Sequence, residues 1–209
     1  MYLVQSTHSQ TPHLISPEER RLHLYHRGDR IILNNQGLWQ VYRGYVQLST
    51  TQISGEEIML GWAQPNSFFG QALSRLQVCE ARALCDVYLR WFFLPEIEQS
   101  PHLAQLVLKQ LIQRLRQSEA LLTIAGQRRV EERLYYFLKL LKDELGEATP
   151  EGVTLPIRLT HQNFANALGT TRVTITRLMG KLQKEGQIGF NRDRHLVIHQ
   201  PEFFDNTLF

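Results

Sequence analysis

The chain of 209 residues is 43% apolar and 21% charged and has no low-complexity tract, so it can bury one sizeable hydrophobic core or two modest ones, and we expect two domains. Its longest apolar runs are only a few residues, and its first ten residues, MYLVQSTHSQ, lack the basic-then-apolar layout of a signal peptide. These features exclude a transmembrane helix and predict a cytoplasmic protein with no membrane partner.

The formal net charge of +3 is unevenly distributed along the chain. Residues 1–100 carry eight Arg, no Lys and nine Asp or Glu, whereas residues 101–209 carry fifteen Lys or Arg and eleven Asp or Glu. Residues 158–199 alone hold seven Lys or Arg against two acids. The basic excess near the C-terminus favours a polyanionic partner.

Catalytic and metal-binding motifs are missing from the sequence. Cys79 and Cys85 lack the CxxC spacing of a metal or cluster site, and we expect both to be buried thiols. The eight histidines are scattered, and no nucleophile–base constellation, phosphate loop or metal-spaced histidine set appears. The sequence therefore predicts neither an enzyme nor a metal site.

In chain order, short apolar or alternating runs broken by glycines come first, from about residue 22 to residue 94. Turn residues recur about every eight to twelve positions, which is typical of an antiparallel β-barrel or sandwich. We expect this β-domain to occupy residues 1–100. Together with the helices that follow, it predicts an α+β fold.

After Pro95 the pattern changes to leucines at spacings of three and four, which predicts a long helix over residues 101–126. Such a helix extends about 40 Å, too far for one small domain to cover. We therefore expect it to pair with the same helix of a second copy; the alternative is a surface helix packed along its own β-domain. The apolar positions are Leu103, Leu106, Val107, Leu111, Leu115, Leu121 and Leu122.

Residues 127–209 predict a DNA-binding domain. A second helix over QRRVEERLYYFLKLLKDELG ends at Gly146, and the polar loop EATPEGVTLP leads to a short helix, HQNFANAL, capped by Thr160 with Asn163. Ala165 and Gly169, four residues apart, supply the small and flexible residues that a tight helix-turn-helix crossing needs.

The helix after Gly169, capped by Thr170 or Thr171, has one apolar stripe, formed by Ile175, Leu178, Met179 and Leu182. Its other face presents Arg and Thr with almost no acid. Because a major groove accepts one helix and arginine pairs bidentately with guanine, we expect Arg172 and Arg177 to read bases and Val173 to pack on a thymine methyl group.

The remaining expected DNA contacts lie beside these readers and on a wing. QIGFNRDRHLVIH predicts two strands around a turn that presents Arg192 and Arg194 to the DNA backbone. The full set of expected DNA-contacting residues is Thr171, Arg172, Val173, Thr174, Thr176, Arg177, Lys181, Arg192 and Arg194.

A β-rich domain, a long helix and a winged helix-turn-helix in this order resemble the CRP/FNR family of bacterial transcription regulators over nearly the whole chain. The matching turns include Gly28-Asp29, Gly44, Gly55-Glu56 and PNSFFGQ at residues 65–71. The helix TTRVTITRL is similar to that of the family's cyanobacterial nitrogen regulators. The resemblance implies a cyclic-nucleotide-binding-like jelly roll, a dimerisation helix, GTA/TAC-type half-sites arranged as a palindrome and read by a homodimer, and RNA polymerase as a partner.

The resemblance also bears on what the β-domain senses. Family members that bind cyclic AMP use the Glu of a Gly-Glu turn and an Arg further along the loop, but here Gln71 follows Gly70 and only four residues separate Gly70 from Arg75. Cyclic AMP is therefore not expected. Residues 62–100 contain no histidine for haem, and the cysteines of an iron–sulfur cluster are missing.

RLRQSEALLTIAGQRRVEERL at residues 114–134 resembles the helix in which nitrogen regulators place an Arg and a Glu, five residues apart, at a 2-oxoglutarate site between subunits. Arg114 and Glu119 match, and an Arg fits a carboxylate by forked hydrogen bonds. The resemblance implies 2-oxoglutarate or another small acid as effector; an ordinary salt bridge or a solvated face is the alternative. The candidate effector residues are Gly70, Gln71, Ala72, Arg75, Arg82, Arg114 and Glu119.

A sequence-specific dimeric transcription regulator is thus the leading prediction. The alternative from a different class is a ligand-sensing module whose C-terminal domain serves protein contacts without specific DNA readout. A gel shift on a GTA/TAC palindrome separates the two.

Overall fold

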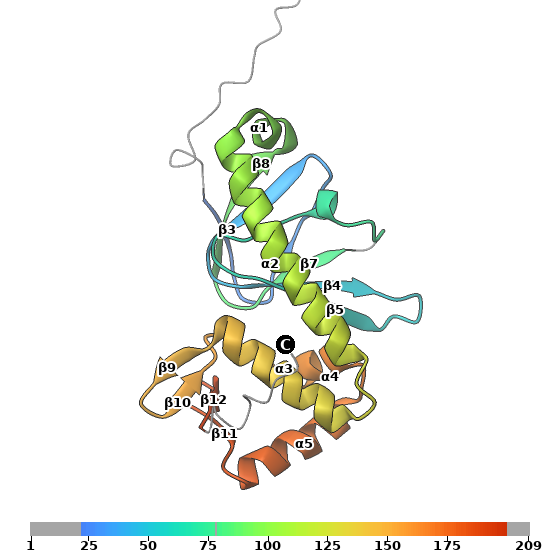
Figure 1. The fold of residues 1–209 in the computed structure, drawn as a ribbon, viewed down its shortest axis with the longest axis vertical. Helices are drawn as coiled ribbons and strands as arrows, with labels where there is room; N and C mark the ends of the chain where they lie inside the picture. The colour runs from blue at the N-terminus through green and yellow to red at the C-terminus, as the bar shows by residue number, and fades with distance from the viewer. Residues whose placement is uncertain (1–21, 78, 200–209) are drawn as a thin grey trace, which may run out of the picture.

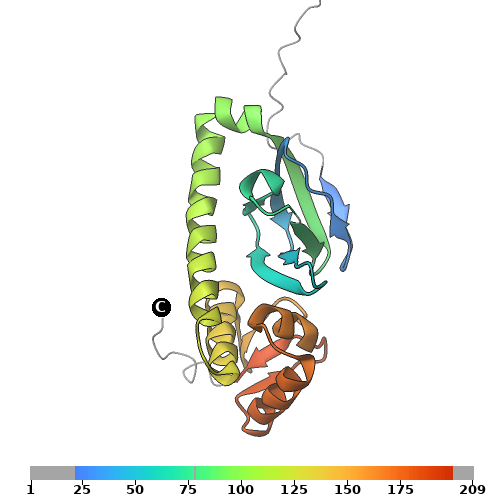
Figure 2. The same ribbon diagram turned by 90° about the vertical axis from the view of Figure 1, so that its right-hand side faces the viewer.

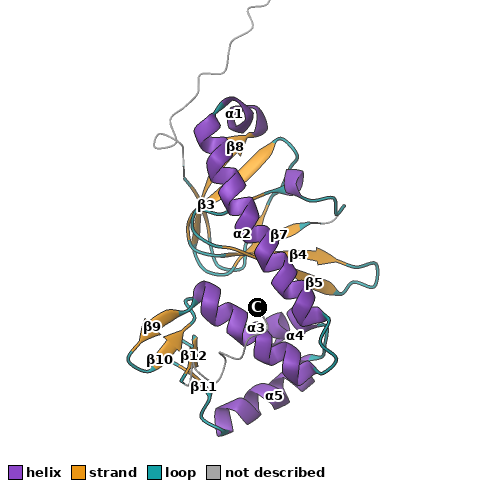
Figure 3. Ribbon diagram, in the orientation of Figure 1, coloured by secondary structure: helices purple, strands orange, loops and turns teal. Residues whose placement is uncertain are grey.

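The computed structural model of the protein describes residues 22–77 and 79–199, so the expected domain limits at residues 1 and 209 and the N-terminal segment lie outside the described residues. Figure 1 shows a β-rich domain above a helical domain with a small sheet of its own, and one long helix running from the first toward the second. Figure 3 separates the two by secondary structure. The expected α+β fold class is confirmed.

Two four-stranded antiparallel sheets form the N-terminal domain, in the strand orders β1-β8-β3-β6 and β2-β7-β4-β5. Apolar side chains from both sheets, including Val41, Leu89 and Val46, pack between them as one core. The domain is thus a jelly-roll-like sandwich. Its strands are β1 (His23–Tyr25), β2 (Arg30–Ile31), β3 (Gly37–Arg43), β4 (Val46–Thr51), β5 (Glu57–Ala63), β6 (Phe68–Phe69), β7 (Glu80–Ala83) and β8 (Val87–Phe93).

The long helix α2 (Pro101–Ala125) follows the short α1 (Leu94–Gln99) and lies along the jelly roll, as Figure 2 shows from the side. Ser100 caps it by accepting the Leu103 N–H. The alternative interpretation, a helix packed along its own β-domain, describes one face of α2. Leu103 and Val107 are buried there and Leu111 is half-buried.

A second row of α2 side chains faces away from the jelly roll. Its exposed apolar members are Leu108, Ile112, Leu115 and Leu122. The expected leucine set therefore mixes two faces, and Leu108 and Ile112 of the outer row were not in it. Spacing alone could not assign each residue to a face, because positions three and four apart occur on both.

The C-terminal domain has its core among α3 (Val130–Leu145), α4 (His161–Leu168) and α5 (Arg172–Lys184). A four-stranded antiparallel sheet in the order β11-β12-β10-β9 flanks them. Its strands are β9 (Glu147–Thr149), β10 (Gly152–Thr154), β11 (Ile188–Phe190) and β12 (Leu196–Ile198). The core continues into the jelly roll, where Trp62 and Phe137 meet edge to face with ring centroids 6.1 Å apart.

Within residues 22–77 and 79–199, no helix is long and apolar enough to cross a membrane. Cys79 and Cys85, expected to be buried thiols, are half-buried free thiols, and burial raises the pKa of each.

Candidate nucleic-acid interface

α4 and α5 form a helix-turn-helix whose turn depends on a glycine. α4 begins with the expected capping box, in which Thr160 and Asn163 exchange hydrogen bonds. Gly169 ends α4 in the left-handed region, at φ 57° and ψ 50°, and its N–H donates to the Ala165 carbonyl. Thr171 then caps α5 through its hydroxyl. These local bonds fix where α5 leaves α4.

Apolar packing and two polar contacts hold the helix-turn-helix together and join it to α3. The buried side chains at the crossing are Phe164, Leu168, Ile175, Leu178 and Met179. His161 Nδ1 of α4 lies 2.9 Å from Thr176 Oγ1 of α5. The guanidinium of Arg133 in α3 donates to the Leu168 carbonyl at the end of α4. The packed face of α5 thus lies against the core of the domain, and its opposite face points outward.

The outward face of α5 carries the expected readers. Arg172, Arg177 and Lys181 are exposed, and Val173 exposes 78% of its surface. An apolar side chain this exposed on a well-packed helix is available for contact with a partner. Thr174, in contrast, is half-buried, and its backbone N–H and hydroxyl both contact the Thr171 hydroxyl.

Arg177 already has a partner in the free protein. Its Nη2 lies 3.5 Å from Glu131 Oε1 at the start of α3, and both side chains are more than half exposed. The pKa of Glu131 is lowered, chiefly by a hydrogen bond from its own backbone N–H and further by Arg177. Because exposed ion pairs of this kind are weak, Arg177 can exchange Glu131 for another acceptor.

The expected wing is present between β11 and β12. Asn191 closes its turn by accepting the His195 N–H at 2.9 Å through Oδ1 and the Arg194 N–H at 2.9 Å through its carbonyl. Arg194 adopts a positive φ of 59° at the tip, and Arg192 and Arg194 are both exposed. The wing thus presents two cations beside α5.

A separate cavity of about 220 Å³ lies between the jelly roll and α2. Of the expected effector residues, the structure brings only Gly70 and Arg114 to its wall, among mostly apolar side chains such as Leu33, Leu60 and Leu73. The others lie elsewhere. Gln71 donates to the Leu76 carbonyl, and Ala72 and Arg75 are exposed. Arg82 donates to the Gly28 carbonyl from the outer face of β7. Glu119 is exposed on α2, about 140° around the helix axis from Arg114.

Arg114 is held by the protein itself. Its guanidinium donates to the Leu60 carbonyl of β5 at 2.8 Å and to Gln117 Oε1. Gln117 in turn accepts the Trp62 N–H at 3.2 Å and donates to Glu144 Oε2 of α3 at 2.6 Å. Burial lowers the pKa of Arg114 and raises the pKa of Glu144.

This chain of contacts joins β5, α2 and α3, and so connects the cavity wall to the DNA-binding domain. Sequence reasoning found Arg114 but missed Gln117 and Glu144. A glutamine and a glutamate on amphipathic helices carry no sequence signal of burial, and their contact spans 27 residues.

Comparison with known proteins agrees with this geometry. Residues 132–205 match the model of the Crp-like helix-turn-helix domain. The chain is 30% identical over 200 residues to the global nitrogen regulator of Nostoc sp., covering 91% of this chain and 87% of that protein. It is 33% identical over 190 residues to the global nitrogen regulator of Synechococcus elongatus, covering 84% of each.

Two further relatives widen the comparison. The chain is 32% identical over 190 residues to the regulatory protein CysR of Synechococcus elongatus, covering 90% of this chain and 87% of that protein. A CRP/FNR-family transcriptional regulator of Thermus thermophilus has the same fold, with a TM-score of 0.71 and 24% identity over 88% of this chain and 96% of that one. The helix-turn-helix, the wing and these relatives together establish that the chain belongs to the CRP/FNR family of DNA-binding transcription regulators.

Proposed function

We propose that the protein reads palindromic DNA sites of the GTA/TAC type as a homodimer. The observation that carries this proposal is the outward face of α5, where Arg172 and Arg177 flank the exposed Val173. Arginine donates two hydrogen bonds to guanine in the major groove, and a valine methyl packs on thymine. A guanine and an adjacent thymine are the first two bases of GTA.

The outer row of α2 supports the dimer. Leu108, Ile112, Leu115 and Leu122 are exposed at spacings of four, three and seven residues, and Glu119 takes the heptad position between the last two. This is the spacing of a two-helix seam. A dimer formed along it presents its two α5 helices to half-sites about one helical turn apart.

A small acid is the effector that the cavity next to α2 fits best. Arg114 supplies the fixed positive charge among the residues that line it, and most of the rest are apolar. A monocarboxylate with an apolar body satisfies both features. In 2-oxoglutarate the second carboxylate would be left without a cation, which is costly in an apolar site, and cyclic AMP lacks a partner for its ribose.

Such an acid would act through the contacts that Arg114 already makes. A carboxylate would compete with the Leu60 carbonyl and the Gln117 side chain for the Arg114 guanidinium. Gln117 in turn donates a hydrogen bond to Glu144 of α3. Binding in the cavity would thereby alter the packing between α2 and α3, and α3 shares its hydrophobic core with α5. We also propose RNA polymerase as a partner. Because chromosomal DNA is the proposed target, we propose that the protein is located in the cytoplasm.

Fluorescence anisotropy with a labelled GTA/TAC palindrome and a scrambled duplex tests the function. We expect the palindrome to bind at least about 10³-fold more tightly, the lower end for specific sites. Equal affinity for both duplexes would instead favour the protein-interaction module. Calorimetry with 2-oxoglutarate, with short monocarboxylic acids and with cyclic AMP tests the effector, and any binding should be lost in Arg114→Met.

A further inference from the structure

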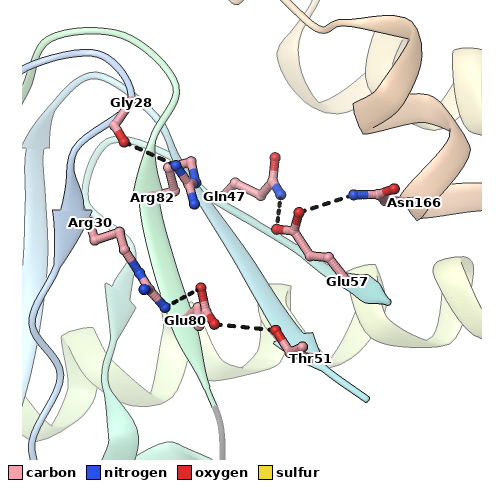
Figure 4. Close-up of polar contacts among 8 residues, drawn as sticks. All are labelled: Gly28, Arg30, Gln47, Thr51, Glu57, Glu80, Arg82 and Asn166. Carbon is pink, nitrogen blue, oxygen red and sulfur yellow. Dashed lines mark hydrogen bonds and ion pairs between the residues drawn. The ribbon is translucent and has the colours of Figure 1, made fainter. Parts of the chain in front are cut away.

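A cluster of four polar side chains joins the DNA-binding domain to the jelly roll. It consists of Gln47 on β4, Glu57 on β5, and Asn163 and Asn166 on α4, and we call it the clamp. Asn163 Nδ2 donates to Gln47 Oε1 at 3.1 Å, and Asn166 Nδ2 donates to Glu57 Oε2 at 3.0 Å. Gln47 Nε2 completes the clamp by donating to Glu57 Oε1 at 2.9 Å. Figure 4 shows Gln47, Glu57 and Asn166 reaching toward one another from the two strands and from α4.

The clamp determines the position of α4 on the sheet more narrowly than apolar packing does, because hydrogen bonds require a particular distance and direction. Two of its bonds end on the Glu57 carboxylate, and bonds to a charged acceptor are stronger than bonds between neutral groups. Gln47 is only 1% exposed, so its amide group cannot exchange these partners for water unless the two domains separate. Asn163 uses its side-chain oxygen to cap α4, which leaves its amide nitrogen for Gln47.

The helix that the clamp holds is the one that carries α5. Only residues 169–171 separate the end of α4 at Leu168 from the start of α5 at Arg172, and the two helices share a buried crossing. The position of α4 on the jelly roll therefore determines where α5 lies relative to α2. Since the outer row of α2 is the proposed seam of the dimer, the same contact determines the distance and the angle between the two α5 helices.

The separation of the two α5 helices must match the separation of the two half-sites. Adding one base pair between half-sites moves one of them by about 3.4 Å along the DNA and rotates it by about 35° around the axis. A dimer that holds its α5 helices at one distance and one angle follows such a change only if contacts between its domains break. We propose that the clamp sets the half-site spacing that the protein accepts, so that its four residues determine specificity without contacting DNA. This inference rests on the proposed palindrome readout.

A series of duplexes tests this role of the clamp in fluorescence anisotropy. Each duplex carries the same two GTA/TAC half-sites at centre-to-centre spacings from about 8 to about 12 base pairs in single steps, and one further duplex carries a single half-site. Wild type should prefer one spacing. Asn166→Ala removes one bond of the clamp and Glu57→Ala removes two. Both should lower the affinity ratio between the preferred spacing and its neighbours by about three- to tenfold, the effect of losing an ordinary hydrogen bond.

Two controls separate this role from general damage to the fold. Both clamp variants should bind the single half-site as wild type does, because no clamp residue lies on α5 or the wing. Thr51→Ala is the matched control on the same hairpin, because the Thr51 hydroxyl donates to Glu80 and not to α4, as Figure 4 shows. This variant should keep the spacing preference of wild type.

An unchanged spacing preference in both clamp variants would overturn the inference while leaving the readout by α5 intact. Equal binding of all spacings by wild type would overturn it as well, because the clamp would then have no spacing to set. A uniform loss of affinity for every duplex, the single half-site included, would also overturn it, since the clamp would then only support the helix-turn-helix. Failure of wild type to prefer the palindrome over a scrambled duplex would instead remove the proposed function on which the inference rests.

Discussion

Replacing Gly61 with alanine should disrupt the junction between the two domains. Gly61 is buried in β5 with a φ of +128°, which residues with side chains rarely adopt. A Cβ at this position would stand closer than 3.0 Å to Gln117 Oε1 and to Arg114 Nη1. Both atoms belong to the contacts that join β5, α2 and α3, so the methyl group must displace them.

Two energetic costs determine how much stability Gly61→Ala loses. The backbone conformation costs about 1–3 kcal/mol once a side chain is present. Moving Gln117 leaves the buried Trp62 N–H without its acceptor, which costs about 1–3 kcal/mol. The sum is about 4 kcal/mol, which corresponds to a fall in Tm of roughly 8–16 °C for a chain of this size.

Thermal unfolding followed by circular dichroism measures this shift. Gly180→Ala is the matched control, because Gly180 lies within α5 and no atom is within 4 Å of its added Cβ. That variant should gain up to about 1 kcal/mol from helix propensity and unfold at a slightly higher temperature. A Tm for Gly61→Ala equal to that of wild type would contradict this prediction, since it would mean that Arg114 and Gln117 move aside freely.

Three further predictions concern the dimer, the buried carboxyl group and the recognition arginine. Leu115→Glu should yield monomers in sedimentation velocity, because Leu115 is 60% exposed on the outer row of α2, whereas a dimeric variant would exclude that row as the seam. Burial raises the pKa of Glu144 above its value in the unfolded chain, so its stabilising contribution is full below pH about 4.5 and is lost as the pH rises through the folded pKa. Glu144→Gln should therefore be at least as stable as wild type at pH 8 and lose that advantage near pH 4.5 in thermal melts; a stability deficit that grows with pH would contradict this. Glu131→Gln frees Arg177 and removes a negative charge near the DNA, so anisotropy should show a few-fold gain in affinity, and weaker binding would show that Glu131 positions Arg177 for the base.

The parts of the fold that follow from local chemistry were predictable from the sequence. The capping box of Thr160 and Asn163, the left-handed Gly169 and the turn before Arg194 each depend on a few adjacent residues. The helices α2, α4 and α5 and the wing could therefore be located to within a few residues, whereas the short helix α1 was not predicted. The exposed face of α5 followed from its apolar stripe.

Features that depend on distant parts of the chain were not predictable in the same way. Asn163 caps its own helix, as expected, but its side chain also donates to Gln47, 116 residues earlier. Glu57 looks like an ordinary hairpin residue until the fold places it against Asn166 of α4. Arg114 was expected to face a ligand, yet it donates to Leu60 and Gln117. Such pairings are set by domain packing, which no local pattern encodes.

Removing one acceptor from the target guanine tests the readout by α5 most directly. A palindrome carrying 7-deazaguanine at the GTA guanine lacks the N7 atom that an arginine fork would contact. Anisotropy with wild type, Arg172→Ala and Arg177→Ala on the natural and modified duplexes forms a double-mutant cycle for each arginine. We predict that the modification weakens binding by wild type by about 1–3 kcal/mol and leaves binding by one of the two variants nearly unaffected. Equal losses in wild type and in both variants would contradict base reading by Arg172 and Arg177.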